Sequence, residues 1–409
     1  MNWSRRSFFK SVSALVAWRA LPAFSESPIP SPNAAPGAFA PGAPAPALQT
    51  GSRVTTRKVP LIHCTDLFHP PEDPDDTVDL ATVFAIPRFD LRAIILDQGL
   101  MQSVSPGRIP VEQMMALTGR RVPYAAGLGT GLRYPEDTGS NQFPNFQAGV
   151  ELILQVLQES KEKVFFTIAG SVRDVVAAYN REPELFHAKA ARLYVNAGNS
   201  AGGDFQWNPL IDPQAYIRLM TSDLPVCWCP SFGRGATINK LAAGTLGTEQ
   251  FQVYWNFRQS EIFSALPAPL QNYFLYALGR KDPAVVDPIA YLGRTPEREL
   301  QERQWRETRN MWSTASIYDA AGLELWRKGD EWAALREPTT GFQPAKTYDF
   351  IPANVTIDRN LRTRLSFSGA AKPFKVFHLL DMKNYQASMQ NSLRRLLSEM
   401  PLVAAEKKP

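Results

Sequence analysis

The chain is poor in cysteine and histidine, with three residues of the first kind and four of the second among 409. Three cysteines are too few for a scaffold held by disulfides, and Cys227 and Cys229 would point to one face of a predicted strand. Buried thiols are therefore expected. No spacing of His or Cys residues resembles a zinc or other soft-metal site, which argues against a thiolate or imidazole centre.

The sequence also lacks a run of about 18 apolar residues long enough to span a bilayer, so we expect no membrane span in the mature chain. Its charge is nearly balanced. The net charge is +5, but the first 25 residues hold four basic residues and no acidic one, and the remainder carries 40 basic against 39 acidic residues. A basic surface for nucleic acid is therefore not expected.

The N-terminal region has the features of an export signal. Residues 4–10 are Ser-Arg-Arg-Ser-Phe-Phe-Lys, and a short, weakly apolar stretch follows. We predict a twin-arginine signal over residues 1–25, which implies a periplasmic or extracellular location, and a Pro/Ala-rich disordered linker over 26–51. The predicted folded domain covers 52–400, with a flexible tail over 401–409.

Apolar, β-branched runs alternate with helix-period segments from residue 58 to residue 229, and no internal repeat is present. This alternation predicts an α/β fold with a mostly parallel, open, doubly wound sheet. The segment 235–312 predicts a helical insertion whose many aromatic residues belong mostly to the core. A C-terminal β-hairpin and a helix over about 382–400 complete the predicted fold.

A cluster of carboxylates follows the first predicted strand. Five acidic residues lie between Asp66 and Asp76, just before a predicted helix. The carboxyl ends of strands form the ligand-binding edge of open α/β sheets, so the cluster is expected at that edge. Helix capping accounts for one or two of these acids, such as Asp75 or Asp76. The mutual repulsion of the remainder favours a hard cation with oxygen ligands, Ca2+ or Mg2+.

Four motifs, in order, resemble those of the inosine/uridine-preferring nucleoside hydrolase superfamily. Asp66 with the pair Asp75 and Asp76 is similar to the opening Asp-x-Asp…Asp-Asp signature, although Cys64 replaces its first acid and the loop is longer. Residues 164–174 are similar to a strand of the family whose end supplies a backbone carbonyl to the metal. Residues 195–213 are similar to its Glu-Phe-Asn…Asp-Pro run, and residues 311–323 to its His-Asp helix start.

The resemblance implies a nucleoside hydrolase-like fold, a nucleoside or related riboside as substrate, and a homo-oligomer. It implies Ca2+ bound by Asp66, Asp76, Asp319 and the Ala169 carbonyl. Asp66 would deprotonate the attacking water. The residues that would contact the substrate are Asp75, Asn199, Gln206, Asn208 and Asp319.

Tyr318 stands where many members of the family carry a histidine that acts as the general acid. It leaves three interpretations open: a weak acid for the leaving base, a ring that stacks on that base, or a buried core residue. His69 in the acidic loop is a substitute candidate for the acid. The predicted catalytic residues are thus Asp66 and Tyr318.

The predicted function is calcium-dependent hydrolysis of N-ribosidic bonds. The alternative is a secreted, cation-dependent sugar- or glycan-binding protein of the same fold without turnover, since the acid histidine is missing and Cys64 replaces an acid. A magnesium phosphohydrolase is disfavoured, because no Lys or glycine-rich phosphate cradle lies at a matching place.

Overall fold

The computed structural model describes residues 57–200, 206–232, 250–367 and 374–403. The predicted export signal and linker lie outside the described residues, as do residues 404–409 of the predicted tail.

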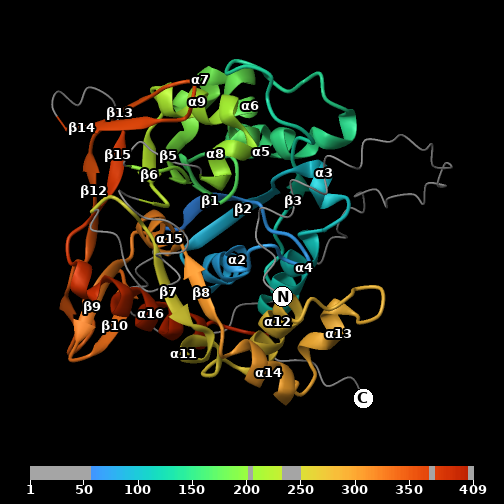
Figure 1. Ribbon diagram of the computed structural model, residues 1–409, viewed down its shortest axis with the longest axis vertical. Helices are drawn as coiled ribbons and strands as arrows, with labels where there is room; N and C mark the ends of the chain where they lie inside the picture. The colour runs from blue at the N-terminus through green and yellow to red at the C-terminus, as the bar shows by residue number, and fades with distance from the viewer. Residues whose placement is uncertain (1–56, 201–205, 233–249, 368–373, 404–409) are drawn as a thin grey trace, which may run out of the picture. The chain divides into compact units, whose positions relative to one another are not determined.

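An eight-stranded sheet forms the centre of the fold (Figure 1), in the spatial order β12-β15-β6-β5-β4-β1-β2-β3. All neighbouring strands are parallel except β12, which is antiparallel to β15. This arrangement confirms the predicted mostly parallel α/β sheet. The strands are β1 (Val59–Thr65), β2 (Phe89–Leu96), β3 (Tyr124–Ala126), β4 (Val164–Ile168), β5 (Ala190–Asn196), β6 (Val226–Cys229), β12 (Tyr348–Pro352) and β15 (Lys375–Leu379).

Helices cover both faces of the sheet. Successive strand residues point to opposite sides, so each strand contributes side chains to both of the layers that the helices form. Leu193 and Tyr194, adjacent on β5, belong to two different apolar clusters. One cluster includes side chains of α2 (Asp75–Ala85), α4 (Arg108–Thr118), α15 (Thr314–Ala321) and α16 (Met382–Ser398). The other includes side chains of α5 (Ala148–Glu159), α6 (Arg173–Arg181), α7 (Pro183–Lys189) and α9 (Pro213–Thr221). The shorter helices are α3 (Gly99–Gln102), η1 (Pro144–Phe146) and α8 (Trp207–Ile211).

The predicted helical insertion contains a strand pair as well as helices. Its first part, residues 235–249, lies outside the described residues. Beyond it, β7 (Trp255–Arg258) and β8 (Thr308–Met311) pair antiparallel. Between these strands lie α11 (Gln259–Phe263), α12 (Ala268–Leu278), α13 (Pro288–Leu292) and α14 (Arg298–Gln304). The mostly helical character is confirmed, and the β7–β8 pair was not predicted.

The C-terminal part contains the predicted hairpin, β13 (Asn354–Ile357) with β14 (Thr363–Ser366), and the predicted final helix, α16. A three-stranded sheet of β9 (Glu324–Lys328), β10 (Glu331–Leu335) and β11 (Gln343–Pro344) was not predicted. After α16 the chain is held at least as far as Val403, whose N–H donates to the Leu117 carbonyl at 2.9 Å. The predicted flexible tail over 401–409 stays a prediction.

The strand order reverses direction between β1 and β4, since β2 and β3 extend to one side and β5 and β6 to the other. In open α/β sheets the crevice outside the carboxyl ends at this point is the usual ligand site. Asp66 and Ala169 are the first residues after β1 and β4, so both lie at this edge. The three cysteines are buried and free, as expected. No helix in the described part of the chain is long and apolar enough to cross a membrane.

Candidate functional site

The predicted acidic cluster forms at the carboxyl edge of β1. Asp75 and Asp76 are the first two residues of α2, and Asp76 is buried. Its Oδ1 accepts a hydrogen bond of 2.5 Å from the Thr65 hydroxyl. Burial, followed by the negative charges of Asp66, Asp75 and Asp79, raises the pKa of Asp76 well above its ordinary value, and Thr65 opposes this. The neighbouring charges that act on Asp76 are therefore all negative.

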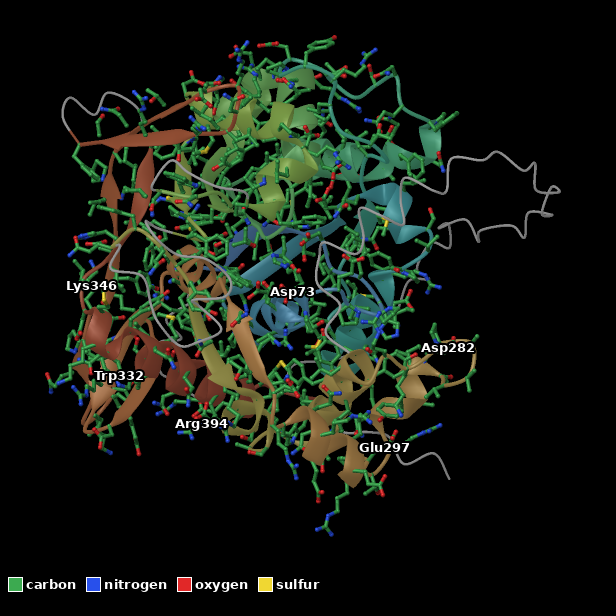
Figure 2. The ribbon with its side chains drawn as sticks, viewed as in Figure 1. Asp73, Asp282, Glu297, Trp332, Lys346 and Arg394 are labelled. Carbon is green, nitrogen blue, oxygen red and sulfur yellow. The ribbon has the colours of Figure 1, made fainter. Side chains whose placement is uncertain are left out.

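The insertion holds the acidic loop in place. His69 is buried, its Nε2 lies 2.6 Å from the Lys281 carbonyl, and its ring stacks on Tyr276 at 4.8 Å between centroids. Burial lowers the pKa of His69. The Arg309 guanidinium lies 3.5 Å from Asp73, which is labelled in Figure 2. His69 is therefore part of the packing between the acidic loop and the insertion.

Asp79 is a buried carboxylate that sequence reasoning did not single out. It is fully buried on α2, and neither of its oxygens accepts a hydrogen bond of ordinary geometry. Burial raises its pKa to about 7; the nearby Ser313 side chain opposes this shift and Asp73 adds to it. The available signal was the spacing of three from Asp76, which puts both side chains on neighbouring parts of one helix face.

Two predicted polar residues, Asn208 and Gln206, form hydrogen bonds at the ends of β4 and β5. Asn208 Nδ2 donates to the carbonyls of Ala169 at 3.3 Å and Asn196 at 2.9 Å. The Gln206 side-chain oxygen accepts from the Gly198 N–H at 2.7 Å. The Ala169 carbonyl, which was predicted to bind a metal, thus accepts a hydrogen bond from the Asn208 side-chain amide. Through these hydrogen bonds, Asn208 and Gln206 hold the backbone at the carboxyl ends of β4 and β5.

Asn199 lies beside the same edge. Its backbone forms an isolated parallel bridge with Phe232, and its carbonyl accepts a 2.5 Å hydrogen bond from the Thr363 hydroxyl. The predicted contact of Asn199 with a substrate hydroxyl stays a prediction.

The structure does not bring Asp319 to the acidic cluster. Its carboxylate accepts the Tyr194 hydroxyl and lies 3.5 Å from Arg192. The reason is the course of α15 along β5: the Ser316 hydroxyl contacts Asn196 at the strand end, and Asp319, one turn later, reaches residues further from that end. In this arrangement Asp319 is engaged with Tyr194 and Arg192, and its predicted metal and substrate roles stay predictions.

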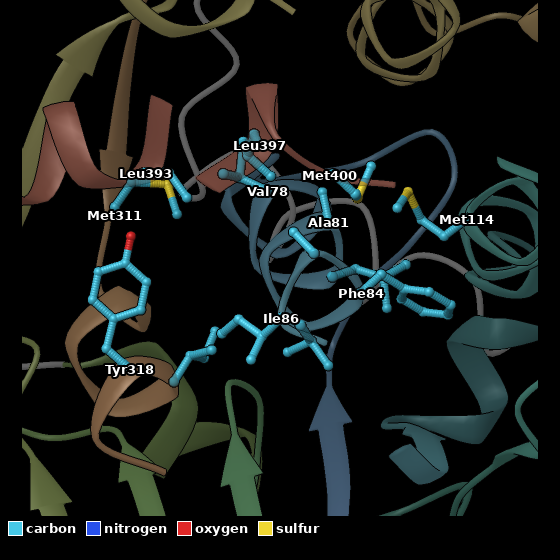
Figure 3. Packing of buried hydrophobic residues seen from close by; sticks show 14 of the residues in the cluster. Val78, Ala81, Phe84, Ile86, Met114, Met311, Tyr318, Leu393, Leu397 and Met400 are labelled. Carbon is cyan, nitrogen blue, oxygen red and sulfur yellow. The ribbon is translucent and has the colours of Figure 1, made fainter. Parts of the chain in front are cut away.

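Tyr318 is a core residue. It is fully buried, and Figure 3 shows its side chain pointing toward Met311 and Leu393. Its hydroxyl accepts a hydrogen bond of 3.3 Å from Ser392 on α16, and burial raises its pKa further above the ordinary value. Of the three interpretations left open by the sequence, the burial of Tyr318 agrees with the third, a buried core residue, and its predicted catalytic role stays a prediction.

A second set of buried acids, also missed, organises the loops at this edge. Asp97, the first residue after β2, accepts hydrogen bonds of 2.8 Å from both the N–H and the hydroxyl of Ser171. Asp174 Oδ1 accepts the Leu128 N–H at 2.7 Å. Ser171 follows Ala169 by two residues, so Asp97 fixes the turn beside the acidic cluster. A lone Asp after an apolar strand was the available signal.

The acidic cluster matches a hard cation in charge and donor type, because it contains carboxylate oxygens and a buried Asp76 surrounded by like charges. It does not form the predicted four-ligand set. Within the described ranges, no three His, Cys, Asp or Glu side chains converge closely enough to hold a metal ion. The residues therefore fit a hard cation in the type and charge of their donor atoms, the carboxylate oxygens of Asp66, Asp75 and Asp76.

No family model matches the chain, and no curated protein matches it by sequence. Among solved structures, it is similar to an inosine-uridine preferring nucleoside hydrolase from Bacillus anthracis at 13% identity, over 83% of this chain and 99% of that one, with a TM-score of 0.42. A purine-preferring ribonucleoside hydrolase from Gardnerella vaginalis is 15% identical over 83% of this chain and 99% of that one, with a TM-score of 0.46. A plant nucleoside hydrolase has the same identity and coverage, with a TM-score of 0.45. At such identities the likeness concerns the fold alone.

Proposed function

We propose that this chain hydrolyses N-ribosidic bonds of nucleosides or related ribosides at the carboxyl edge between β1 and β4, with Ca2+ as its cation. The observation that supports this most is the gathering of Asp66, Asp75 and Asp76 at the point where the strand order reverses. Carboxylates at such a place suit both a hard cation and the hydroxyls of a ribose.

A bound Ca2+ would be held by Asp66 and Asp76 and would supply positive charge and open coordination positions. Asp66, half-buried at the strand end, takes the proton of the attacking water. Asp75, half-buried at the start of α2, accepts hydrogen bonds from ribose hydroxyls. The carboxylates also stabilise the positive charge that develops on the sugar as the bond to the base breaks. Because Tyr318 is in the core, the leaving base departs without a proton from it.

The remaining parts of the proposal come from the sequence. The twin-arginine signal would export the chain, so the riboside is a small molecule met in the periplasm or outside the cell. A homo-oligomer belongs to the same proposal and is tested by the mass of the protein in solution.

A second candidate function is cation-dependent binding of a riboside or sugar without turnover. Two observations favour it: Tyr318 is enclosed in the core, and Asp319 is engaged with Tyr194 and Arg192. Both residues had been expected at the reaction centre. A site without them keeps the carboxylates that bind a diol and lacks the predicted donor of a proton to the leaving base.

The test is release of reducing sugar from purine and pyrimidine nucleosides and from a nitrophenyl riboside, with Ca2+ or with a chelator. Chelator-sensitive cleavage that falls by about a hundredfold or more in Asp66→Asn supports hydrolysis. The matched control is Asp330→Asn, an exposed acid in the β9–β10 turn, which should cleave at the wild-type rate. Absence of cleavage from every riboside, with calcium-dependent binding of a nucleoside by calorimetry, contradicts hydrolysis and supports the second candidate.

A further inference from the structure

The Asp97 carboxylate forms a bridge across the end of β1. Asp97 follows β2 and Ser171 follows β4, and β1 lies between those two strands in the sheet. Strands separated by one neighbour are about 10 Å apart, so a direct contact between their ends is not part of the regular sheet. Asp97 Oδ2 nevertheless accepts the Ser171 N–H, and Oδ1 accepts the Ser171 hydroxyl, both at 2.8 Å. The two chain segments therefore lean toward each other over the end of β1.

Asp66 is the residue that this bridge adjoins, since it is the first residue after β1. The backbone just before it is bonded on both sides. The Thr65 carbonyl accepts the Asp97 N–H at 2.9 Å, and the Cys64 carbonyl accepts the Ala169 N–H at 2.8 Å. The position of Asp66 thus depends on the same two segments that the bridge joins.

Gly170 brings the turn after β4 into contact with Asp66. A methyl group on Gly170 would lie 2.8 Å from Asp66 N, 3.1 Å from Asp66 Cβ and 3.0 Å from Asp97 Oδ2. Non-bonded carbon atoms normally stay about 3.5–4.0 Å from their neighbours, so no side chain fits here. The φ angle of Gly170 lies outside the left-handed region. Close approach of the backbone, and not its conformation, therefore requires glycine at this position.

Gln98 shows that the bridge is kept against backbone strain. Its φ angle is +58°, in the left-handed region that is unfavourable for a residue with a Cβ atom. Its N–H donates to Asp97 Oδ1 at 2.7 Å. Asp97 is only 1% exposed and accepts three hydrogen bonds, so its carboxylate is fixed in direction. Strained backbone that its surroundings hold in place is concentrated at functional sites.

We propose that Asp97, Ser171 and Gly170 position the Asp66 carboxylate for the reaction. The inference rests on the proposed function, in which Asp66 takes the proton of the attacking water. Asp97 acts through the turn after β4 and not on the substrate, because both of its oxygens already accept hydrogen bonds from the protein. A displacement of a reacting group by about 1 Å lowers a rate by as much as about a hundredfold. Asp75, which accepts the ribose hydroxyls, lies on α2 outside the bridge, so the KM should change less than kcat.

The first test measures kcat and KM for riboside cleavage by Gly170→Ala, which adds the methyl group and removes no hydrogen bond. We expect kcat to fall by about tenfold or more and KM to stay within about threefold of the wild type. The matched control is Gly293→Ala, whose added methyl group would meet no atom closer than 3.9 Å. That variant should keep both constants within about twofold. Circular dichroism and the melting temperature check that each variant folds.

The second test breaks the bridge without adding atoms. Asp97→Asn replaces one accepting oxygen by an amide nitrogen, and Ser171→Ala removes the hydroxyl donor. Each should lower kcat by about threefold or more, and the double variant should be no slower than the slower single variant, because both changes remove one connection. Ser171→Thr keeps a hydroxyl donor and should restore most of the wild-type kcat. If Gly170→Ala does not fold, these variants decide the question.

Three results overturn the inference: a wild-type kcat in folded Gly170→Ala, a change in its KM alone, or effects of Asp97→Asn and Ser171→Ala that multiply independently. A wild type that cleaves no riboside contradicts the proposed hydrolysis instead. Hydrogen–deuterium exchange of the peptide that contains residues 62–66 then decides whether the bridge holds Asp66. Faster exchange in Asp97→Asn than in Asp330→Asn, an exposed acid, supports the bridge, and equal exchange overturns it.

Discussion

The buried ion pair between Arg173 and Asp212 offers a demanding test of how the loops at the carboxyl edge are held. Arg173 Nε lies 3.1 Å from Asp212 Oδ2, and the two side chains are only 4% and 0% exposed. The guanidinium also donates to the carbonyls of Leu128 and Ile211. Asp212 accepts the N–H of Leu132 at 2.8 Å and caps α9. One carboxylate thus joins α6, α9 and the loop after β3.

Replacing Asp212 by Ala should reduce the free energy of unfolding by about 3–5 kcal/mol. The change leaves the Arg173 charge buried without its partner, and each backbone N–H that loses its acceptor costs about 1–3 kcal/mol if water does not reach it. Burial raises the pKa of Asp212, although Arg173 opposes the shift, so desolvation outweighs attraction. The pair therefore stabilises little relative to a neutral replacement, while removal of one partner is costly. Asp212→Asn, which keeps an oxygen for the N–H groups, should cost less than Asp212→Ala.

The assay is urea unfolding followed by tryptophan fluorescence and circular dichroism, at a constant concentration of Ca2+. The control is Glu302→Ala in the pair Arg298–Glu302, which has a similar distance of 3.0 Å but side chains that are 89% and 54% exposed. That variant should lose less than about 0.5 kcal/mol, because exposed i,i+4 pairs contribute little. A cost for Asp212→Ala below about 1 kcal/mol, or one equal to that of the control, would refute the reasoning.

Two further predictions concern protons and the core. The pKa values of Asp79 and Asp174 are both raised to about 7, mainly by burial, so the folded chain retains protons that the unfolded chain releases near pH 4. Their contribution to stability is complete below about pH 4 and is lost as the pH rises through about 7, by up to about 4 kcal/mol for each group. Urea unfolding without calcium should accordingly show Asp174→Asn gaining stability relative to the wild type between pH 5 and pH 8, and a constant difference would contradict this. Tyr318→Phe removes a hydroxyl that accepts from Ser392 and should cost about 0.5–1.5 kcal/mol, with an unchanged kcat for riboside cleavage; a large loss of kcat in folded protein would return Tyr318 to the reaction centre.

Most of the central fold could be predicted from the sequence, because its strands are buried on both faces. Runs such as Leu91–Leu96 and Val164–Ile168 are nearly continuous in apolar residues and are separated by segments of helical period. The strand pair β7–β8 was missed because its short strands, Trp255–Arg258 and Thr308–Met311, lie within a region rich in helix formers and aromatic residues. Short edge strands carry little local signal, and their pairing is decided by contacts distant in the sequence.

The candidate site divides in the same way between local and distant information. Asp66, Asp75 and Asp76 are neighbours in the chain, so their joint electrostatic field follows from sequence spacing and the strand-to-helix turn alone. The fate of Asp319 depends on how far α15 has advanced along β5 when that residue is reached, and a motif match contains no information on that distance. A shift of one helical turn, about 5.4 Å, is enough to take a carboxylate from the edge of a sheet to its flank.

The contrast between Asp76 and Asp79 shows why burial, and not residue type, assigns chemistry to this cluster. Both are aspartates on one side of α2, and both are buried. Asp76 has a hydroxyl donor in Thr65, whereas Asp79 has no hydrogen bond of ordinary geometry. A buried carboxylate whose oxygens accept no hydrogen bond of ordinary geometry, beside others of the same charge, is stabilised further by a proton or by a cation from solution. The two possibilities differ in the protons released when Ca2+ binds: a proton leaves Asp79 if the cation binds there, and Asp79 keeps its proton if the proton alone is its partner.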